Sequence, residues 1–264
     1  MPAMTGARAI AVAQTIPVRG DVDANVTRHL RLADVAAEEH AQVLVFPELS
    51  LTGYELDLGA DLAFSEKDAR LAPLAEAASS SSLILIVGAP VRIGSRLHIG
   101  AFIVLPDGTT ELYTKHHLGA FPAGASCDGI VPAAEATFFQ PGDRSPLVRL
   151  GDHVAAVAVC ADTGRPSHPQ AAADRGATSY LAGMFVIPSG FERETATLEA
   201  SAVQHAMTVA FANYGGPSGG LATAGRSTIW SGKGERLARL EATGAGVAVA
   251  VEDRAGWHTR TVML

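Results

Sequence analysis

Along the chain, short runs of Val, Ile, Leu and Ala are followed in several places by segments whose apolar residues recur at helical spacing. This alternation is typical of an α/β protein. Strands are expected at residues 9–13, 43–46, 83–88, 99–105, 154–160, 179–182, 208–213 and 227–230. Helices are expected at residues 23–39, 66–78, 169–175 and 195–205. In the first of these helices, Val26, Leu30 and Ala33 would form part of one buried stripe.

Two turn signals indicate that antiparallel strands are mixed into the sheets. Asp107-Gly108 follows the apolar run at 99–106, and Gly232-Lys233-Gly234 precedes the run at 236–240. Fully parallel doubly wound folds lack such hairpins, so the pattern favours two layered sheets with helices outside over a Rossmann sheet. The 264 residues are interpreted as one domain, residues 1–264.

The composition narrows the class of partner. The chain has 20 Lys and Arg against 27 Asp and Glu, a net charge of -7, and no basic stripe that would favour nucleic acid. Its longest apolar runs, at 83–87 and 154–159, are far shorter than the roughly 20 residues that span a membrane. The first residues also lack the apolar stretch of a secretory signal, so we expect a soluble, cytoplasmic protein without membrane contact. Its two cysteines, Cys127 and Cys160, suit a reducing compartment and free thiols.

Three polar residues, Glu48, Lys115 and Cys160, follow or close apolar runs, where a parallel sheet normally assembles its active site. Taken singly each is ordinary, because a Glu or Lys at a strand end is usually solvated and a Cys there is usually buried packing. Together they meet the needs of nucleophilic catalysis. A base can deprotonate the thiol, and a cation can stabilise the oxygen of the attacked carbonyl.

The local sequences around these residues resemble the motifs of the carbon-nitrogen hydrolase (nitrilase-like) family, in its amidase-type branch. The segment VLVFPELSLTGYE at 43–55 resembles the family's first motif, and ELYTKHHL at 111–118 resembles the second. The segment VAAVAVCAD at 154–162 resembles the third motif, and EATFFQPGD at 135–143 resembles a fourth element. The motifs occur in the family's order and at family-like spacing between Ala9 and about Ala250.

This resemblance implies a four-layer α-β-β-α sandwich that pairs as a homodimer or larger homo-oligomer. It implies that Glu48 is the general base and that Lys115, with the backbone N–H of Ala161, stabilises the oxyanion. Glu135 would hold the lysine or the substrate nitrogen. Cys160 would attack the carbonyl, ammonia or an amine would leave, and water would cleave the thioester. This chemistry requires no metal and no coenzyme.

The expected reaction is the hydrolysis of a small non-peptide carboxamide to a carboxylic acid and ammonia. An N-carbamoyl amine or acid hydrolase is an alternative, and so is a catalytically silent binding or regulatory module. Nitrile hydrolysis is less expected, because nitrile-cleaving members commonly carry Trp-Glu after the cysteine, where this chain has Ala161-Asp162. Candidate pocket residues are Tyr54, Met184 and Phe185.

The stretch ADTGRPSHPQ after the cysteine departs from the usual family pattern. Ala161, Arg165, Ser167 and Gln170 stand where many members have bulkier or charged residues. This departure leaves the identity of the substrate and the oligomer contacts open.

Two competing signals are weaker. GPSGG at 216–220 fits a serine nucleophile elbow, but the residues after Ser218 do not predict the helix that this motif needs.

The nine histidines include no H-E-x-x-H, so they are interpreted as ordinary surface or core residues. His116 and His117 are adjacent, and at most one of them can face the pocket of Lys115 through regular strand geometry. Cys127 lies in the Gly/Pro-rich segment 119–146 and is interpreted as a spectator thiol.

Overall fold

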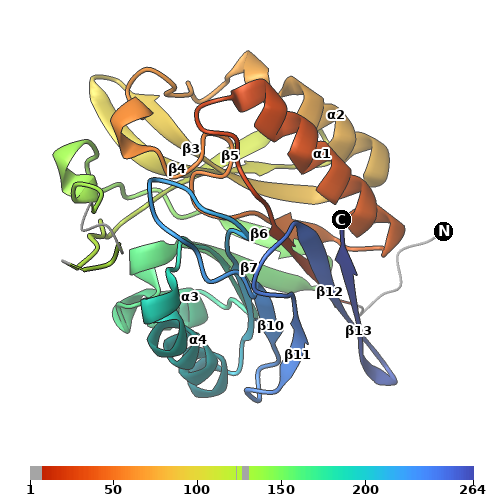
Figure 1. Cartoon of the computed structure of the whole chain (residues 1–264). Helices are drawn as coiled ribbons and strands as arrows, with labels where there is room; N and C mark the ends of the chain where they lie inside the picture. The colour runs from red at the N-terminus through yellow and green to blue at the C-terminus, as the bar shows by residue number, and fades with distance from the viewer. Residues whose placement is uncertain (1–7, 123, 127–130) are drawn as a thin grey trace.

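Two stacked β-sheets form the centre of the molecule, and helices cover the outer face of each (Figure 1). The computed structural model describes residues 8–122, 124–126 and 131–264. The seven-stranded sheet has the order β13-β12-β1-β2-β3-β4-β5, and the six-stranded sheet has the order β11-β10-β9-β8-β7-β6. Helices α1 (Val22–Glu38) and α2 (Ala72–Ser81) cover the first sheet, and α3 (Ser167–Asp174) and α4 (Phe191–His205) cover the second.

The strands of the first sheet are β1 (Arg8–Gln14), β2 (Val43–Val45), β3 (Ile84–Ile93), β4 (Arg96–Val104), β5 (Thr110–Thr114), β12 (Gly246–Asp253) and β13 (Gly256–Met263). Those of the second are β6 (Leu147–Leu150), β7 (His153–Val159), β8 (Ser179–Gly183), β9 (Thr208–Ala212), β10 (Thr228–Trp230) and β11 (Arg236–Arg239). The inner strands β1, β2 and β3 are parallel, as are β7, β8 and β9, whereas the flanking strands pair antiparallel.

Three apolar clusters fill the spaces between the four layers. Successive side chains of a strand point to opposite faces, so β2 directs Val45 toward the second sheet and Leu44 toward the helices. In the same way Val157 of β7 lies between the sheets, whereas Ala158 packs on the α3/α4 side. Because both faces of each sheet are covered, the sequences of the inner strands are nearly continuous apolar runs. The expected α-β-β-α sandwich is confirmed.

Both predicted hairpins are present. The β4–β5 hairpin turns at Asp107-Gly108, where Gly108 has a φ of +82°, and the β10–β11 hairpin turns through Gly234 with a φ of +79°. Positive φ is a conformation that glycine adopts without steric cost. The sheets are therefore mixed, as the turn signals indicate.

The expected helix at 66–78 is wrong in its first part. The α-helix begins only at Ala72, and Ala69–Leu71 forms a single 3-10 turn that Asp68 caps by accepting from the backbone N of Arg70 at 3.1 Å. Pro73 occupies the first helical turn, where its missing N–H costs nothing. Strands β6, β12 and β13 are absent from the prediction, and β5 and β11 are expected only as the second arms of the two hairpins. Strand β13 lies at the edge of its sheet and its middle residues are exposed, so its sequence is polar and lacks an apolar run.

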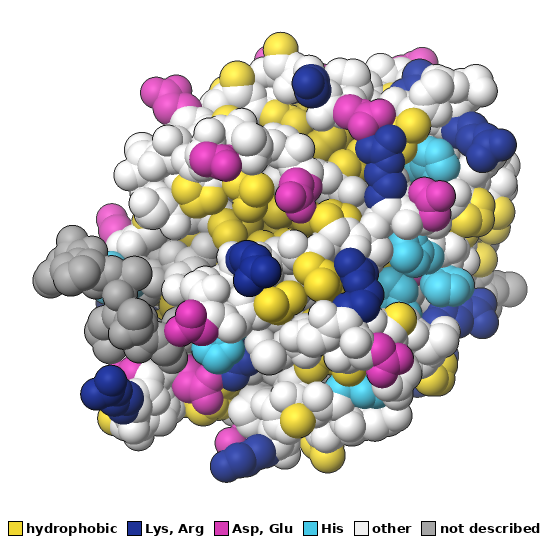
Figure 2. All heavy atoms as spheres, turned by 180° about the vertical axis from the view of Figure 1, so that it is seen from behind, with side chains coloured by type: hydrophobic (Ala, Val, Ile, Leu, Met, Phe, Trp, Pro, Cys, Tyr) yellow, Lys and Arg dark blue, Asp and Glu magenta, His cyan; other side chains and the backbone are white. Residues whose placement is uncertain are grey.

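The surface carries charges of both signs. On the face that Figure 2 shows, Lys and Arg side chains are interspersed with Asp and Glu rather than gathered into one stripe. Among the described residues, no helix has both the length and the apolar character needed to cross a membrane.

One fully buried histidine docks α1 onto the turn after β2. The Nδ1 of His29 lies 2.7 Å from the backbone O of Asn25, its Nε2 lies 2.9 Å from the Oγ of Ser50, and its ring stacks on Phe46 with centroids 4.0 Å apart. The geometry fits a neutral ring that donates through Nδ1 and accepts through Nε2. Burial lowers the pKa of His29 from its ordinary 6.5 to about 4, because a charged ring would lose its hydration.

This histidine should make the fold sensitive to acid. Its pKa in the folded state is depressed, so its contribution to stability is complete above about pH 6.5 and is lost as the pH falls toward 4. Between about pH 7 and about pH 4.5, the free energy of unfolding of the wild type should fall by roughly 2–3 kcal/mol more than that of His29→Gln. Urea unfolding at both pH values measures this difference. His40→Asn is the control, because His40 is exposed at a φ of +59° that Asn tolerates. An identical pH dependence in wild type and His29→Gln would contradict the prediction.

Candidate active site

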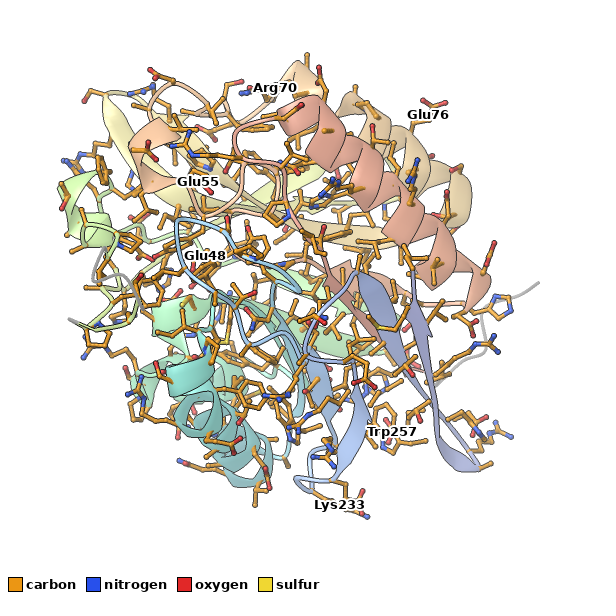
Figure 3. The ribbon with its side chains drawn as sticks, viewed as in Figure 1. Glu48, Glu55, Arg70, Glu76, Lys233 and Trp257 are labelled. Carbon is orange, nitrogen blue, oxygen red and sulfur yellow. The ribbon has the colours of Figure 1, made fainter. Side chains whose placement is uncertain are left out.

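Glu48 lies in the interior between the two sheets, in the turn that follows β2 (Figure 3). The backbone of this turn passes very close to both sheets. A Cβ atom on Gly88 of β3 would lie 2.3 Å from the backbone N of Leu49, and one on Gly183 of β8 would lie 2.6 Å from the backbone O of Phe46. Any side chain at either position would displace the backbone, so the two glycines allow Glu48 to sit between the layers.

Lys115 is fully buried directly after β5 and lies between two carboxylates. Its Nζ is 2.6 Å from Oε1 of Glu48 and 2.7 Å from Oε1 of Glu135. Glu135 comes from a 3-10 turn (Glu135–Thr137) in the long segment after β5. It also accepts hydrogen bonds from the hydroxyl of Tyr54 at 2.6 Å and from the backbone N of Gly119 at 2.7 Å. The structure therefore brings together one ammonium and two carboxylates from three separate parts of the chain.

Cys160 follows β7 and begins a 3-10 turn (Cys160–Asp162). Its φ of +43° lies in the left-handed region, which is uncommon for a residue with a side chain and occurs most often at functional sites. Its Sγ lies 3.8 Å from the backbone O of Phe185. The Cys160 side chain lies near enough to Glu48 to influence the pKa of that carboxyl. The thiol thus joins the buried Glu48–Lys115–Glu135 cluster.

Burial dominates the electrostatics of this cluster. It raises the pKa of Glu48 to about 8, although the ammonium of Lys115 acts in the opposite direction. Burial also raises the pKa of the Cys160 thiol, and the nearby charge of Glu48 adds to this effect. Burial alone would lower the pKa of Lys115, but the negative charges of its neighbours outweigh it and keep the amine protonated.

One carboxylate oxygen of Glu48 makes no hydrogen bond to the described residues. Oε1 is held by Lys115, whereas the buried Oε2 has no hydrogen-bond partner among the residues that the structure describes. A carboxylate with a raised pKa and a free oxygen beside a thiol is suited to accept a proton near neutral pH.

A pocket of about 340 Å³ opens onto Cys160. The rings of Tyr54 and Phe185 stack in its wall with centroids 4.2 Å apart, and the ring of Phe121 meets both edge-on. Its lining is mainly apolar near the cysteine and includes Arg193 and Glu194 from the first turn of α4. The pocket is bounded by Tyr54, Gly119, Ala120, Phe121, Pro122, Glu135, Cys160, Ala161, Phe185, Val186, Ile187, Ser189, Gly190, Arg193 and Glu194.

Of the three residues expected in the pocket wall, Tyr54 and Phe185 line it and Met184 does not. The side chain of Met184 is buried in the α3/α4-side cluster, where its sulfur lies 4.0 Å from the Oγ1 of Thr163. Neighbouring residues of an extended segment point to opposite sides, so the orientation of Phe185 toward the pocket directs Met184 away from it. Arg193, Glu194 and Phe121 lack a local sequence signal that would have marked them as pocket residues.

The stretch after the cysteine divides between the pocket and the surface. Ala161 lines the pocket, but Arg165, Ser167 and Gln170 are exposed. The unusual residues at those three positions therefore alter the surface near α3 rather than the pocket wall. Cys127, expected as a spectator thiol in the long segment after Lys115, lies outside the described residues.

The serine-hydrolase alternative does not fit the structure. Ser218 is buried in a loop, its Oγ accepts from the backbone N of Tyr54 at 2.8 Å, and it donates to Oε1 of Glu55 at 3.2 Å. No helix follows it before β10. The hydroxyl therefore fixes the loop that carries Tyr54.

The adjacent histidines also lie away from the pocket. His117 makes hydrogen bonds to Asp162, and His116 stacks on Tyr113 with ring centroids 5.2 Å apart. Within the described ranges, no group of three or more His, Cys, Asp and Glu residues is arranged to hold a metal ion.

The family model of the carbon-nitrogen hydrolases matches residues 9–259, and the chain belongs to this family. Solved structures of the nitrilase superfamily are similar to the chain as well. An amidase of the nitrilase superfamily from Nesterenkonia AN1 has a TM-score of 0.79 and 27% sequence identity, with 92% of this chain and 90% of that chain covered. Another structure of that amidase shows the acetamide moiety of fluoroacetamide covalently added at its active-site cysteine.

Two curated relatives extend the comparison. A nitrilase from Pyrococcus abyssi is 26% identical over 252 residues, which cover 92% of this chain and 89% of the relative. A glutamine-dependent NAD(+) synthetase from Thermotoga maritima is 25% identical over 174 residues, which cover 65% of this chain but only 28% of the synthetase. The chain thus matches less than a third of that larger protein. Family and neighbours together define an enzyme that hydrolyses carbon–nitrogen bonds other than peptide bonds.

Proposed function

We propose that the protein hydrolyses a small non-peptide carboxamide to a carboxylic acid and ammonia through a thioester on Cys160. The observation that carries this proposal is the buried Glu48–Lys115–Glu135 cluster, with distances of 2.6 and 2.7 Å, beside a thiol at the floor of a pocket. A nucleophile, a base and a fixed cation in one enclosed site are the parts that acyl transfer requires.

In the first half of the reaction, Glu48 takes the thiol proton and the sulfur of Cys160 attacks the carbonyl carbon. The negative charge that develops on the carbonyl oxygen is stabilised by the ammonium of Lys115 and the backbone N–H of Ala161. The carbon–nitrogen bond breaks, the leaving nitrogen takes the proton from Glu48, and ammonia departs. The thioester remains on Cys160. Glu135 holds Lys115 in place through its 2.7 Å contact.

In the second half, water enters the site of the departed ammonia and loses a proton to Glu48 as its oxygen attacks the thioester. The carbon–sulfur bond breaks, the carboxylic acid leaves, and the proton on Glu48 returns to the sulfur. The same carboxyl thus acts in turn as base, acid, base and acid, which its pKa of about 8 makes feasible near neutral pH.

The pocket supports a small substrate with an apolar acyl chain. Its volume of about 340 Å³ lies at the lower end of the range for ligand pockets, roughly 300–1,000 Å³. The rings of Tyr54, Phe121 and Phe185 offer apolar contact beside the cysteine. The Nesterenkonia amidase, which has also been seen in complex with butyramide, is consistent with an acyl group of this size.

The test is a panel of short aliphatic amides, ω-amidated acids including glutamine, and N-carbamoyl amines. We expect equal amounts of ammonia and acid from at least one amide, and intact-mass detection of the acyl adduct on Cys160 at early times. A peptide substrate without a free carboxamide is the control and should remain uncleaved. Turnover of the carbamoyl compounds alone would identify the N-carbamoyl alternative. The absence of both product and adduct across the panel would favour a silent binding or regulatory module.

A further inference from the structure

Asp162 holds a fully buried carboxylate directly behind the candidate nucleophile, and four donors satisfy it. Its Oδ1 accepts from the backbone N of His117 at 2.8 Å and contacts the Nδ1 of the same residue at 2.9 Å. Its Oδ2 accepts from the hydroxyl of Tyr113 at 2.6 Å and from the backbone N of Val159 at 3.2 Å. None of these contacts belongs to the proposed chemistry at Cys160.

These partners come from both sheets. Tyr113 and His117 lie two residues before and two residues after Lys115, at the end of β5 in the seven-stranded sheet. Val159 precedes Cys160 at the end of β7 in the six-stranded sheet. A single carboxylate therefore ties the segment that carries the ammonium to the turn that carries the thiol.

The backbone conformation of the turn at Cys160 needs contacts that hold it in place. Its φ of +43° is strained for a residue with a Cβ, and strained backbone persists only where surrounding contacts fix it. The bond from the backbone N of Val159 to Asp162 closes this turn on one side, and the bonds to Tyr113 and His117 anchor it to the other sheet.

We propose that Asp162 is a positioning residue that fixes the thiol of Cys160 relative to Lys115 and Glu48. It does not touch the substrate, because it is fully buried and does not line the pocket. Its part in turnover rests on the proposed amide hydrolysis, whereas its part in placing a reactive thiol does not. Displacement of a reacting group by about 1 Å can cost about 10²-fold in rate, so a loosened turn should be visible in kinetics.

The same cluster offers a matched pair of variants. His168 lies between two buried tyrosines, with Nε2 2.9 Å from the hydroxyl of Tyr113 and Nδ1 2.8 Å from the hydroxyl of Tyr180. Both hydroxyls contact His168, but only that of Tyr113 also reaches Asp162. Tyr113→Phe and Tyr180→Phe therefore remove the same atom from similar surroundings, and only the first cuts a link between the two sheets.

The experiment compares these two variants with the wild type in three measurements: kcat and KM on the best amide, the rate of Cys160 alkylation by iodoacetamide, and the midpoint of urea unfolding. Tyr113→Phe should lower kcat by about tenfold or more with little change in KM, and should slow alkylation in parallel. Tyr180→Phe should shift the urea midpoint by a similar amount but leave kcat and alkylation near wild type. Asp162→Asn, where it folds, should show the larger loss of kcat, and Asp162→Glu should not restore it, because the longer side chain misplaces both oxygens.

The outcomes separate the two proposals. Equal kinetic effects in the two tyrosine variants, or a loss confined to KM, would overturn the positioning role. Alkylation that is slowed only in Tyr113→Phe supports that role even if the wild type hydrolyses no amide, in which case the proposed function alone fails. Unchanged alkylation in Tyr113→Phe, with normal amide turnover by the wild type, removes the positioning role and leaves the proposed function intact.

Discussion

Replacement of Cys160 by alanine is expected to abolish amide hydrolysis, with a fall in kcat/KM of about 10⁴-fold or more. The substitution removes the atom that forms the thioester, and the other members of the cluster cannot replace it. Glu48 and Glu135 are held by Lys115, and that ammonium has no lone pair while it is protonated. Ammonia release measures the loss, and intact mass should show no acyl adduct on the variant.

The matched control is Ser218→Ala. Ser218 is the nucleophile of the competing motif at 216–220, yet its hydroxyl is occupied by Tyr54 and Glu55. This variant should keep most of its hydrolytic activity and still form the adduct. Retained turnover in Cys160→Ala, or complete loss of hydrolytic activity in Ser218→Ala with the fold intact, would contradict the cysteine mechanism.

Replacement of Glu48 by glutamine is expected to lower kcat by about 10²–10⁴-fold while KM changes little, because a positioned base contributes this much to proton transfer. Glutamine has nearly the same shape but cannot accept the thiol proton at neutral pH. The carboxyl has a pKa of about 8 and is active as the carboxylate, so the fraction in the active form grows as the pH rises. In the wild type, kcat/KM should therefore rise with pH and level off above about pH 8.

The pH profile gives this prediction its sharpest measurement. The rise below pH 8 should be missing in Glu48→Gln, whatever activity remains. Glu252→Gln is the control, because Glu252 of β12 pairs with Arg8 of β1 and does not line the pocket. An unchanged kcat in Glu48→Gln, or an unchanged pH profile, would remove Glu48 from the role of base.

The sequence predicts the layers well because their pattern is local. Every strand read from an apolar run is present, and both hairpins turn at the expected glycines. The errors lie where a local pattern is ambiguous. The helix expected from residue 66 begins at Ala72, since Asp68 caps a separate 3-10 turn before it. The pairing of copies and the cellular compartment stay predictions.

The pocket wall was predicted only in part. Tyr54 and Phe185 line the pocket, but Met184 turns into the outer cluster, because neighbouring residues in an extended segment face opposite ways. Which of the two faces the cysteine depends on how the sheets stack, and no residue spacing encodes that. Arg193 and Glu194 reach the pocket only because α4 packs across the second sheet beside it.

By itself the sequence determined that Glu48, Lys115 and Cys160 stand at the ends of apolar strands, and, by resemblance, that Glu135 belongs with them. Only the tertiary structure decided that they meet: contacts of 2.6 and 2.7 Å join the ends of two strands of the seven-stranded sheet to a long loop, and Cys160 comes from the six-stranded sheet. It also decided the left-handed turn at Cys160 and the link through Asp162. The physical reason is that hydrophobic periodicity specifies each strand and its buried faces, whereas distances between strands far apart in the sequence follow from how whole layers pack.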